Sequence, residues 1–310
     1  MSSYRNSLLL ALTFVSTIPA YAQTIKVTLL GTGNPRPVIE RFGPSILVDA
    51  GNQKLLFDCG RGATQRLYQL KVPFNEVDAL FLTHLHSDHT VGIPDLWLTG
   101  WIMGRTVPLR IWGPKGTQQM ISHLQQAYEY DVHIRRDVDE KLAGPGAVLV
   151  PKEISEGVIY ENRGVTVTAF AVDHRPIKPA FGYRVDFAGH SVVLSGDTRF
   201  SENLIRFAKG TDVLIHEVLD PEAYNQLKED SVFTNEQRQK VIAHHITPRE
   251  AGMVFTRVKP KLAVYSHIVP PAVPDVIPHT RKTYSGPLEV GEELMSIEIG
   301  EKIEVRRPGS

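Results

Sequence analysis

The segment 81–92, FLTHLHSDHTVG, limits what this 310-residue chain can fold into more than any other stretch. A short run of apolar and β-branched residues leads directly into three histidines and an aspartate. His84 and His86 are two residues apart, so in an extended segment their side chains project to the same side. Asp88 and His89 follow where the chain begins to turn. One loop at the end of a strand therefore presents four nitrogen and oxygen ligands, which predicts a metal site.

Four ligands drawn from six residues would crowd a single metal ion, whereas two ions can share them. His84 and His86 would then bind one ion, and Asp88 and His89 would bind the other. Each ion needs further ligands from elsewhere in the chain, because a zinc site takes three or four protein ligands.

Three residues in the second half of the sequence can supply these ligands. His174 follows the strand-like run VTVTAFAVD, Asp197 ends SVVLSGD and His267 ends KLAVYSH. In each case a predicted strand delivers a ligand-type residue where it stops. Each also has an alternative interpretation, since Asp197 can cap a helix that starts near Thr198, and the two histidines can be ordinary residues at the rim.

Short β-like runs bounded by turn residues alternate with helical patterns along the chain. They form two β-rich halves, separated by the Gly/Pro-rich segment Ala143–Pro151. Two sheets packed face to face with helices outside would bury such strands in one unit. The predicted strands are 25–33, 45–51, 53–60, 79–84, 108–113, 165–172, 181–187, 190–197, 212–218 and 261–268, with a helix at 62–70.

The first residues differ from the rest. Arg5 precedes an apolar run, and AYA at Ala20–Ala22 has the spacing of a signal-peptidase site. We therefore predict that 1–22 is a removed signal peptide and that 23–310 is a single domain, periplasmic or secreted. The alternative is a buried N-terminal helix. No other apolar run reaches the ~18 residues of a membrane span, so no membrane association is expected.

Charge and cysteine content narrow the class of protein. Lys+Arg and Asp+Glu number 34 each, and loss of Arg5 with the signal leaves 33 basic residues against 34 acidic ones. Such a balance lacks the basic excess typical of nucleic-acid binding, so no nucleic-acid partner is expected. Cys59 is the only cysteine, which excludes an intramolecular disulfide and an all-cysteine zinc site. We predict that it is a small buried hydrophobe.

Together these segments resemble the metallo-β-lactamase-fold hydrolases. THLHSDH matches the His-x-His-x-Asp-His signature of that superfamily. GTGNPRP, DHRPIKPAFGYRV, SGDT, DVLIHEV, HHIT and YSHI narrow the resemblance to the branch that contains ribonuclease Z and certain arylsulfatases. The resemblance covers almost the entire mature chain. It implies an α/β fold, an αββα four-layer sandwich of two mixed β-sheets packed face to face with helices outside and metals at one edge.

The resemblance also assigns roles to individual residues. Glu217 and His245 match a proton relay beside the metals, and His245 is favoured over His244 because it stands two residues before Thr247. Asp58 matches a position that supports the ligand loop. The implied ligands of two divalent ions are His84, His86 and His174 on one ion, Asp88, His89 and His267 on the other, and Asp197 between them.

This set of residues implies ester hydrolysis by a metal-bridging hydroxide. Two dications ~3.5–4 Å apart lower the pKa of a shared water toward ~7 and neutralise charge in the transition state. Asp88 would be both ligand and acceptor of the water's proton, while His245, kept protonated by Glu217, would donate a proton to the leaving group. Imidazole and carboxylate ligands favour Zn²⁺ and also admit Mn²⁺, Fe²⁺ or Co²⁺.

The sequence constrains the substrate less. Predicted export, neutral charge and the short interval from His174 to Asp197, too short for the tRNA-gripping arm of many ribonuclease Z proteins, favour a small-molecule ester. An aryl sulfate or a phosphodiester is expected. The alternatives are a β-lactamase, lactonase or carboxylesterase of the same fold, and a non-catalytic metal-binding protein. Trp97 and Trp101 either line an aryl pocket or, as we favour, pack in the core. The sequence also allows a homodimer.

Overall fold

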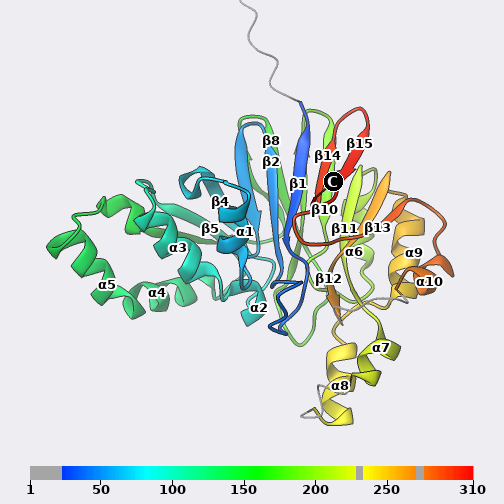
Figure 1. Ribbon diagram of the computed structural model, residues 1–310. Helices are drawn as coiled ribbons and strands as arrows, with labels where there is room; N and C mark the ends of the chain where they lie inside the picture. The colour runs from blue at the N-terminus through cyan, green and yellow to red at the C-terminus, as the bar shows by residue number, and fades with distance from the viewer. Residues whose placement is uncertain (1–22, 228–232, 270–275, 310) are drawn as a thin grey trace, which may run out of the picture.

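A computed structural model describes residues 23–227, 233–269 and 276–309 (Figure 1). Two mixed sheets pack face to face, and helices cover their outer faces. The predicted four-layer sandwich is therefore confirmed. The predicted signal peptide, 1–22, lies outside the described residues and stays a prediction. Within the described ranges, no helix has the length and apolar character needed to cross a membrane.

The first sheet has eight strands and also contains the C-terminal end of the chain. Pairing is antiparallel from β15 to β3 and parallel from β3 to β6. The prediction that the strands divide into a first and a second half of the chain is thus only partly correct. The last hairpin returns to the first sheet, where Ile299 pairs with Ile25. In order across the sheet the strands are β15 (Ile303–Arg306), β14 (Ser296–Ile299), β1 (Ile25–Gly31), β2 (Ser45–Ala50), β3 (Gln53–Phe57), β4 (Val77–Phe81), β5 (Leu109–Gly113) and β6 (Leu149–Glu153).

The second sheet has seven strands, parallel from β13 to β10 and antiparallel from β10 to β7. Every residue of β11 and β12 is buried. Both are central strands covered on two faces, which explains their continuous apolar runs. In order the strands are β13 (Leu288–Val290), β12 (Leu262–Val269), β11 (Val213–Leu219), β10 (His190–Leu194), β9 (Phe181–Phe187), β8 (Val165–Ala171) and β7 (Gly157–Asn162).

Helices pack on both outer faces. The helices of the first sheet are α1 (Ala63–Gln69), α3 (Ile93–Ile102) and α4 (Thr117–Ala127), and those of the second are α6 (Glu202–Ala208), α9 (Pro248–Val258) and α10 (Val276–Arg281). The remaining helical elements are α2 (Ser87–Thr90), α5 (Glu129–His133), α7 (Pro221–Gln226), α8 (Asn235–Ile242), η1 (Phe74–Glu76), η2 (Ile134–Val138) and η3 (Gly144–Ala147). In Figure 1, α7 and α8 extend below the second sheet, while α4 and α5 project at the far side of the first.

The two tryptophans of α3 belong to the core. Trp97 and Trp101 are each 1% exposed, and their indole nitrogens donate to the carbonyls of Ala147 (3.0 Å) and Ala143 (2.9 Å). These hydrogen bonds fasten α3 to the η3 segment. The favoured interpretation as core residues is correct, and the aryl-pocket alternative is excluded.

The apolar layer between the sheets also holds the start of the ligand loop. Phe57 and Phe81 stack there with ring centroids 5.0 Å apart. Tyr183 of β9 is buried beside them, and its hydroxyl donates to the carbonyl of Leu82 at 2.5 Å. A residue of the second sheet thereby fixes the backbone of the first sheet immediately before the histidine-rich loop.

Candidate metal centre

The ligand loop leaves the end of β4 and packs against the turn after β3. The amide of Cys59 donates to the carbonyl of His89 (2.8 Å), and the amide of Gly92 donates to the carbonyl of Cys59 (2.9 Å). A Cβ on Gly60 would lie 2.4 Å from the carbonyl oxygen of Asp88, so only glycine allows this close approach. Cys59 itself is buried, as predicted.

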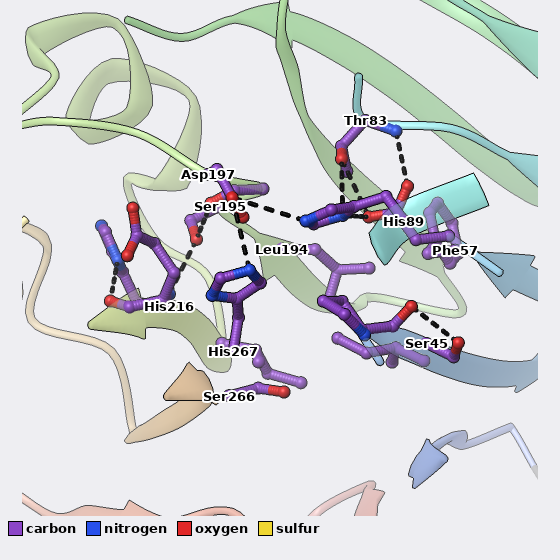
Figure 2. A pocket seen from close by; sticks show the side chains of 16 residues that line it. Ser45, Phe57, Thr83, His89, Leu194, Ser195, Asp197, His216, Ser266 and His267 are labelled. Atoms are coloured by element: carbon purple, nitrogen blue, oxygen red, sulfur yellow. Dashed lines mark hydrogen bonds and ion pairs between the residues drawn. The ribbon is translucent and has the colours of Figure 1, made fainter. Parts of the chain in front are cut away.

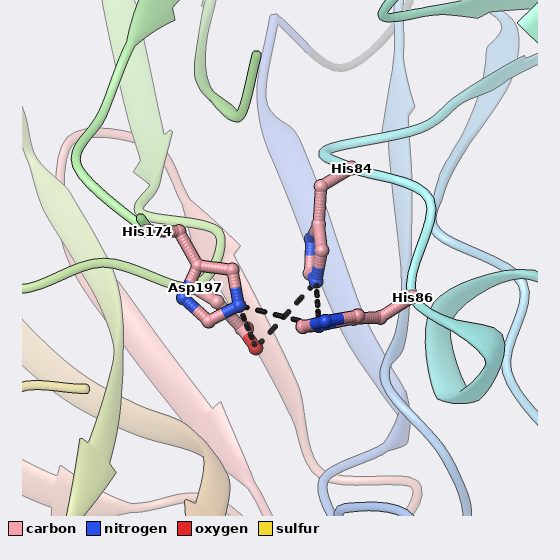
Figure 3. A group of neighbouring side chains, drawn as sticks. All are labelled: His84, His86, His174 and Asp197. Carbon is pink, nitrogen blue, oxygen red and sulfur yellow. Dashed lines mark hydrogen bonds and ion pairs between the residues drawn. The ribbon is translucent and has the colours of Figure 1, made fainter. Parts of the chain in front are cut away.

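One group of ligand atoms forms around His84, His86 and His174 (Figure 3). His86 Nδ1 lies 2.9 Å from His84 Nε2 and 3.2 Å from His174 Nε2. Asp197 Oδ2 lies 3.8 Å from the Nε2 atoms of both His84 and His174. His86, directly before α2, and His174, which follows β8, thus converge from different sheets.

A second group combines Asp88, His89 and His267. Asp88 Oδ2 lies 3.7 Å from His89 Nε2 and 3.5 Å from His267 Nε2. Asp197 Oδ2 is again near, at 3.4 Å from His89 and 3.3 Å from His267, as Figure 2 shows. The same carboxylate oxygen therefore faces both groups.

These residues fit a pair of divalent metal ions. Two ligand atoms bound at ~2.0–2.1 Å to one tetrahedral zinc lie ~3.3 Å apart. The ligand atoms of the two groups are separated by 2.9–3.8 Å, close to this value. His89 Nε2, Asp197 Oδ1 and both ring nitrogens of His267 are buried without a hydrogen-bond partner among the described residues. Buried polar atoms are normally paired, so this concentration of unpaired atoms supports a cation site.

Supporting residues turn the imidazoles toward the groups. Asp58 accepts from His89 Nδ1 at 2.8 Å and from the amide and hydroxyl of Thr83. Since the Thr83 hydroxyl donates to Asp58, we assign it as acceptor from His84 Nδ1 at 3.0 Å. Each histidine then keeps an Nε2 lone pair for a metal. Asp58 thus lies where the resemblance placed it, whereas Thr83 was missed.

His174 receives its support from a backbone atom. Its Nδ1 donates to the carbonyl of His244 at 3.0 Å. This places His244 beside the site through its main chain, while its ring lies 5.8 Å from that of His174. No side-chain pattern marks a carbonyl acceptor, so the sequence could not have indicated this contact.

At two of the predicted ligands, the local structure differs in detail from the sequence prediction. The strand that holds His267 does not stop there but continues to Val269, and a bulge places His267 in a left-handed conformation with φ 51°. The irregular backbone aims its side chain toward the site. Asp197 is not a helix cap either, since α6 begins at Glu202 and is capped by Ser201.

The two groups differ in charge. Burial lowers the pKa of His84 well below its ordinary value and that of His174 to about 4, so the first group presents neutral imidazoles. In the second, burial is outweighed by Asp197 and Asp88, which raise the pKa of His267 to about 9. Neighbouring carboxylates likewise raise the pKa of His89, so the protonated histidines supply positive charge that a bound cation would supply instead.

Glu217 and His245 form the expected pair beside the groups. His245 Nδ1 lies 3.0 Å from Glu217 Oε1, which also accepts from the amide of Thr198 at 2.9 Å. Burial lowers the pKa of His245 to about 4, and burial together with Asp197 raises the pKa of Glu217 well above its ordinary value. The pair is thus in place, and the protonated state of His245 that the resemblance implies stays a prediction.

A cleft of about 380 Å³ opens over both groups. Its lining includes Asp88, Asp197 and His267 from the groups, and His245 from the relay. The cleft therefore gives a ligand access to the metal ligands and to the relay at once.

Fold and site together define the protein as a metal-dependent hydrolase of the metallo-β-lactamase fold, acting on ester or phosphodiester bonds. A family model described as anti-Pycsar protein Apyc1 matches residues 25–257. Ribonuclease Z of Mycobacterium sp. (strain KMS) is 35% identical over 291 residues, which cover 92% of this chain and 100% of the relative. The chain therefore belongs to the family that this model describes, within the ribonuclease Z-like metallo-β-lactamase-fold proteins.

Solved structures agree on the fold. The metallo-β-lactamase-fold protein YhfI from Bacillus subtilis superposes with a TM-score of 0.68 at 20% identity, covering 89% of this chain and 99% of that one. Human tRNase Z, short form, superposes with a TM-score of 0.64 at 21% identity, with the same coverage of both chains.

These relationships correct one prediction. The expectation of no nucleic-acid partner is wrong, because the relatives are named as ribonucleases that include a tRNase. The error has a physical reason. Balanced charge describes the whole chain, whereas a phosphodiester would contact only a local cleft, where bound metal ions would supply the positive charge.

Proposed function

We propose that this protein hydrolyses the phosphodiester bonds of nucleic acids or nucleotides, using two divalent metal ions. The observation that carries the proposal is the position of Asp197 Oδ2, within 3.8 Å of imidazole nitrogens in both ligand groups. A shared carboxylate would hold two cations side by side, the arrangement found in many phosphatases and nucleases. Similarity to ribonuclease Z supports the choice of bond.

The ligands would divide as the two groups do. His84, His86 and His174 would hold one ion, and Asp88, His89 and His267 the other, with Asp197 contributing to both. When bound, the ions supply Lewis acidity at the phosphoryl oxygens and lower the pKa of the attacking water. Imidazole and carboxylate ligands without thiolate favour zinc.

Two side chains of the protein would move protons in this reaction, Asp88 at the attacking water and His245 at the departing oxygen. Asp88 faces the cleft and can accept a proton from the attacking water. His245 has Nδ1 engaged by Glu217, which leaves Nε2 to donate a proton to the departing oxygen. Glu217 would then pass its own proton to Nδ1, so that the pair ends as a neutral imidazole beside a carboxylate. The pair then carries one negative charge until it takes up a proton again.

A panel of chromogenic substrates tests this function. Metal-loaded protein would be assayed with bis(4-nitrophenyl) phosphate, 4-nitrophenyl sulfate, 4-nitrophenyl acetate and a chromogenic cephalosporin, together with a short RNA. We expect the phosphodiesters to give the highest kcat/KM, and Asp197→Ala to abolish their turnover. Preferential hydrolysis of the sulfate or the cephalosporin would contradict the proposal and favour the arylsulfatase or β-lactamase alternative.

A further inference from the structure

One wall of the cleft is built by α7, α8 and the residues that flank them. Tyr224 of α7, Val241 of α8 and Phe233, just before α8, all line the cleft that also contains Asp88 and Asp197. A largely carbon surface therefore shares one cavity with the reacting centre. In Figure 1, α7 and α8 lie at the end of the sandwich where α2 also lies.

The two aromatic residues of this wall differ in exposure. Tyr224 is 3% exposed, and the guanidinium carbons of Arg36 and Arg238 lie 5.5 Å and 5.8 Å from its ring centroid. The buried ring thus already makes two cation–π contacts. Phe233, in contrast, is 43% exposed. Phe233 is therefore the aromatic side chain of this wall that has surface left for a ligand.

Helix capping does not account for the exposed ring. Thr234 caps α8 in a capping box with Gln237, so Phe233 occupies the position just before the cap. An apolar residue there usually packs on the fourth residue of the helix. Here that residue is Arg238, whose guanidinium donates to the carbonyls of Tyr224 and Leu227. The fourth residue of α8 therefore does not supply Phe233 with the usual apolar partner.

We propose that Phe233 is a specificity-determining residue, on which a planar ring of the substrate, such as a nucleobase, stacks while its phosphodiester lies at the ligand groups. This inference rests on the proposed function and identifies the part of the substrate that the α7–α8 wall recognises. A cleft of about 380 Å³ is within the range that holds a small ligand such as one nucleotide unit. Aromatic side chains are the usual stacking platforms for unpaired bases.

Two substrates with the same leaving group isolate this contact. Thymidine 5′-(4-nitrophenyl phosphate) carries a base, whereas methyl 4-nitrophenyl phosphate does not. We expect wild-type protein to prefer the thymidine diester in kcat/KM. Phe233→Ala should reduce that preference by about 5- to 150-fold, the effect of losing one base stack, mainly through KM. Turnover of the methyl diester should fall much less, because it lacks the base and its nitrophenyl ring is the leaving group that both substrates share.

Further variants separate stacking from general hydrophobicity and folding. Phe233→Trp should keep the preference, whereas Phe233→Leu, which retains apolar volume without a π-face, should lose most of it. Tyr130→Ala removes an 80% exposed aromatic residue on α5, remote from the cleft, and should behave as wild type. Circular dichroism of each variant checks that the fold persists.

A binding measurement gives a readout that does not depend on turnover. Calorimetric titration should show thymidine 5′-monophosphate binding more weakly to Phe233→Ala than to wild type, with inorganic phosphate binding equally to both. Equal loss for both ligands, or an unchanged diester preference in Phe233→Ala, would overturn the inference and leave the proposed function standing. Absence of turnover of both diesters by wild type would instead overturn the proposed function.

Discussion

Asp58 Oδ2 lies 2.8 Å from His89 Nδ1, and the same carboxylate accepts from both the amide and the hydroxyl of Thr83. Asp58 thereby ties the turn after β3 to both ends of the ligand loop. Its backbone adopts a left-handed conformation with φ 55°, which a non-glycine residue rarely keeps without a compensating contact. The fold accepts local strain here to orient His84 and His89.

Asp58→Asn should weaken metal binding by about 10- to 100-fold, the usual effect of losing a group that orients a metal-binding histidine. The amide cannot accept all of the hydrogen bonds that the carboxylate accepts, so His89 loses its fixed ring orientation. Competition with a chromogenic chelator measures the change. Asp78→Asn is the matched control, because among the described residues Asp78 accepts from the exposed Lys54 amide alone. Equal affinity of Asp58→Asn and wild type would contradict this role.

Removal of single ligands should separate the two groups. His174→Ala takes a ligand from the first group alone, and His267→Ala takes one mainly from the second. We expect about one metal ion per chain to be retained in each, against two in wild type, because the other group stays intact. Asp197→Ala should retain little of either ion. Elemental analysis after gel filtration counts the ions, and full occupancy in Asp197→Ala would refute the shared-ligand arrangement.

Gly60→Ala should disrupt the ligand loop. The added methyl group would lie 2.4 Å from the Asp88 carbonyl oxygen and 2.5 Å from the Gly43 carbonyl carbon, and backbone cannot yield as a flexible side chain can. Overpacking of this kind typically costs about 1–3 kcal/mol. Urea unfolding and metal affinity should both report the loss. The control is Gly144→Ala, where the nearest neighbour of the new methyl group is Arg136 Cδ at 3.6 Å.

His216 should make stability depend on pH. It is 1% exposed, its Nδ1 donates to the Glu217 carbonyl at 2.9 Å, and burial lowers its pKa to about 4. Between pH 6.5 and 4 the unfolded chain binds a proton on this residue that the folded chain does not. The free energy of unfolding should therefore fall as pH falls through this window, and His216 should contribute about 2 kcal/mol of the loss by pH 5.

Comparison with His216→Phe separates the contribution of His216 to the pH dependence of unfolding from that of the other histidines. Urea unfolding of both proteins at pH 7.5 and pH 5 gives the difference in pH dependence, while any constant packing effect cancels. The variant should lose less stability on acidification than wild type. Parallel losses in the two proteins would show that His216 already binds its proton in the folded state.

The local sequence was sufficient to predict the ligand loop, whereas the contacts around that loop depend on long-range packing. The spacing of His84 and His86 and the strand before them were sufficient to predict converging ligands, and most predicted strands agree with the structure to within a few residues. The bulge that turns His267 toward the site was not predictable, because it depends on pairing between β11 and β12. The C-terminal strands β14 and β15 were missed since they are short and half-buried.

His245→Ala should separate the proton donor from the metal ligands. His245 Nδ1 is engaged by Glu217 Oε1, and the two ligand groups assigned above do not include it. The variant should therefore keep both metal ions, while its rate falls by about 10²–10⁴-fold, as general acid–base catalysis typically contributes. The ligand atoms of His245 also lie within reach of Asp197 and His267, so the test must count the metal ions as well as measure the rate. Elemental analysis and single-turnover rates on the same preparation test the two parts.

The loss should depend on the leaving group. An alkoxide of high pKa needs the proton of His245 as it departs, whereas a nitrophenolate leaves readily as an anion. A series of phosphodiesters with leaving groups from nitrophenol to an alkyl alcohol should therefore show a steeper dependence of rate on leaving-group pKa in His245→Ala than in wild type. Glu217→Gln should share this pattern in weaker form, because the amide cannot return a proton to Nδ1. An equal loss across the series would mean that His245 positions the substrate, and loss of metal would mean that it is itself a ligand.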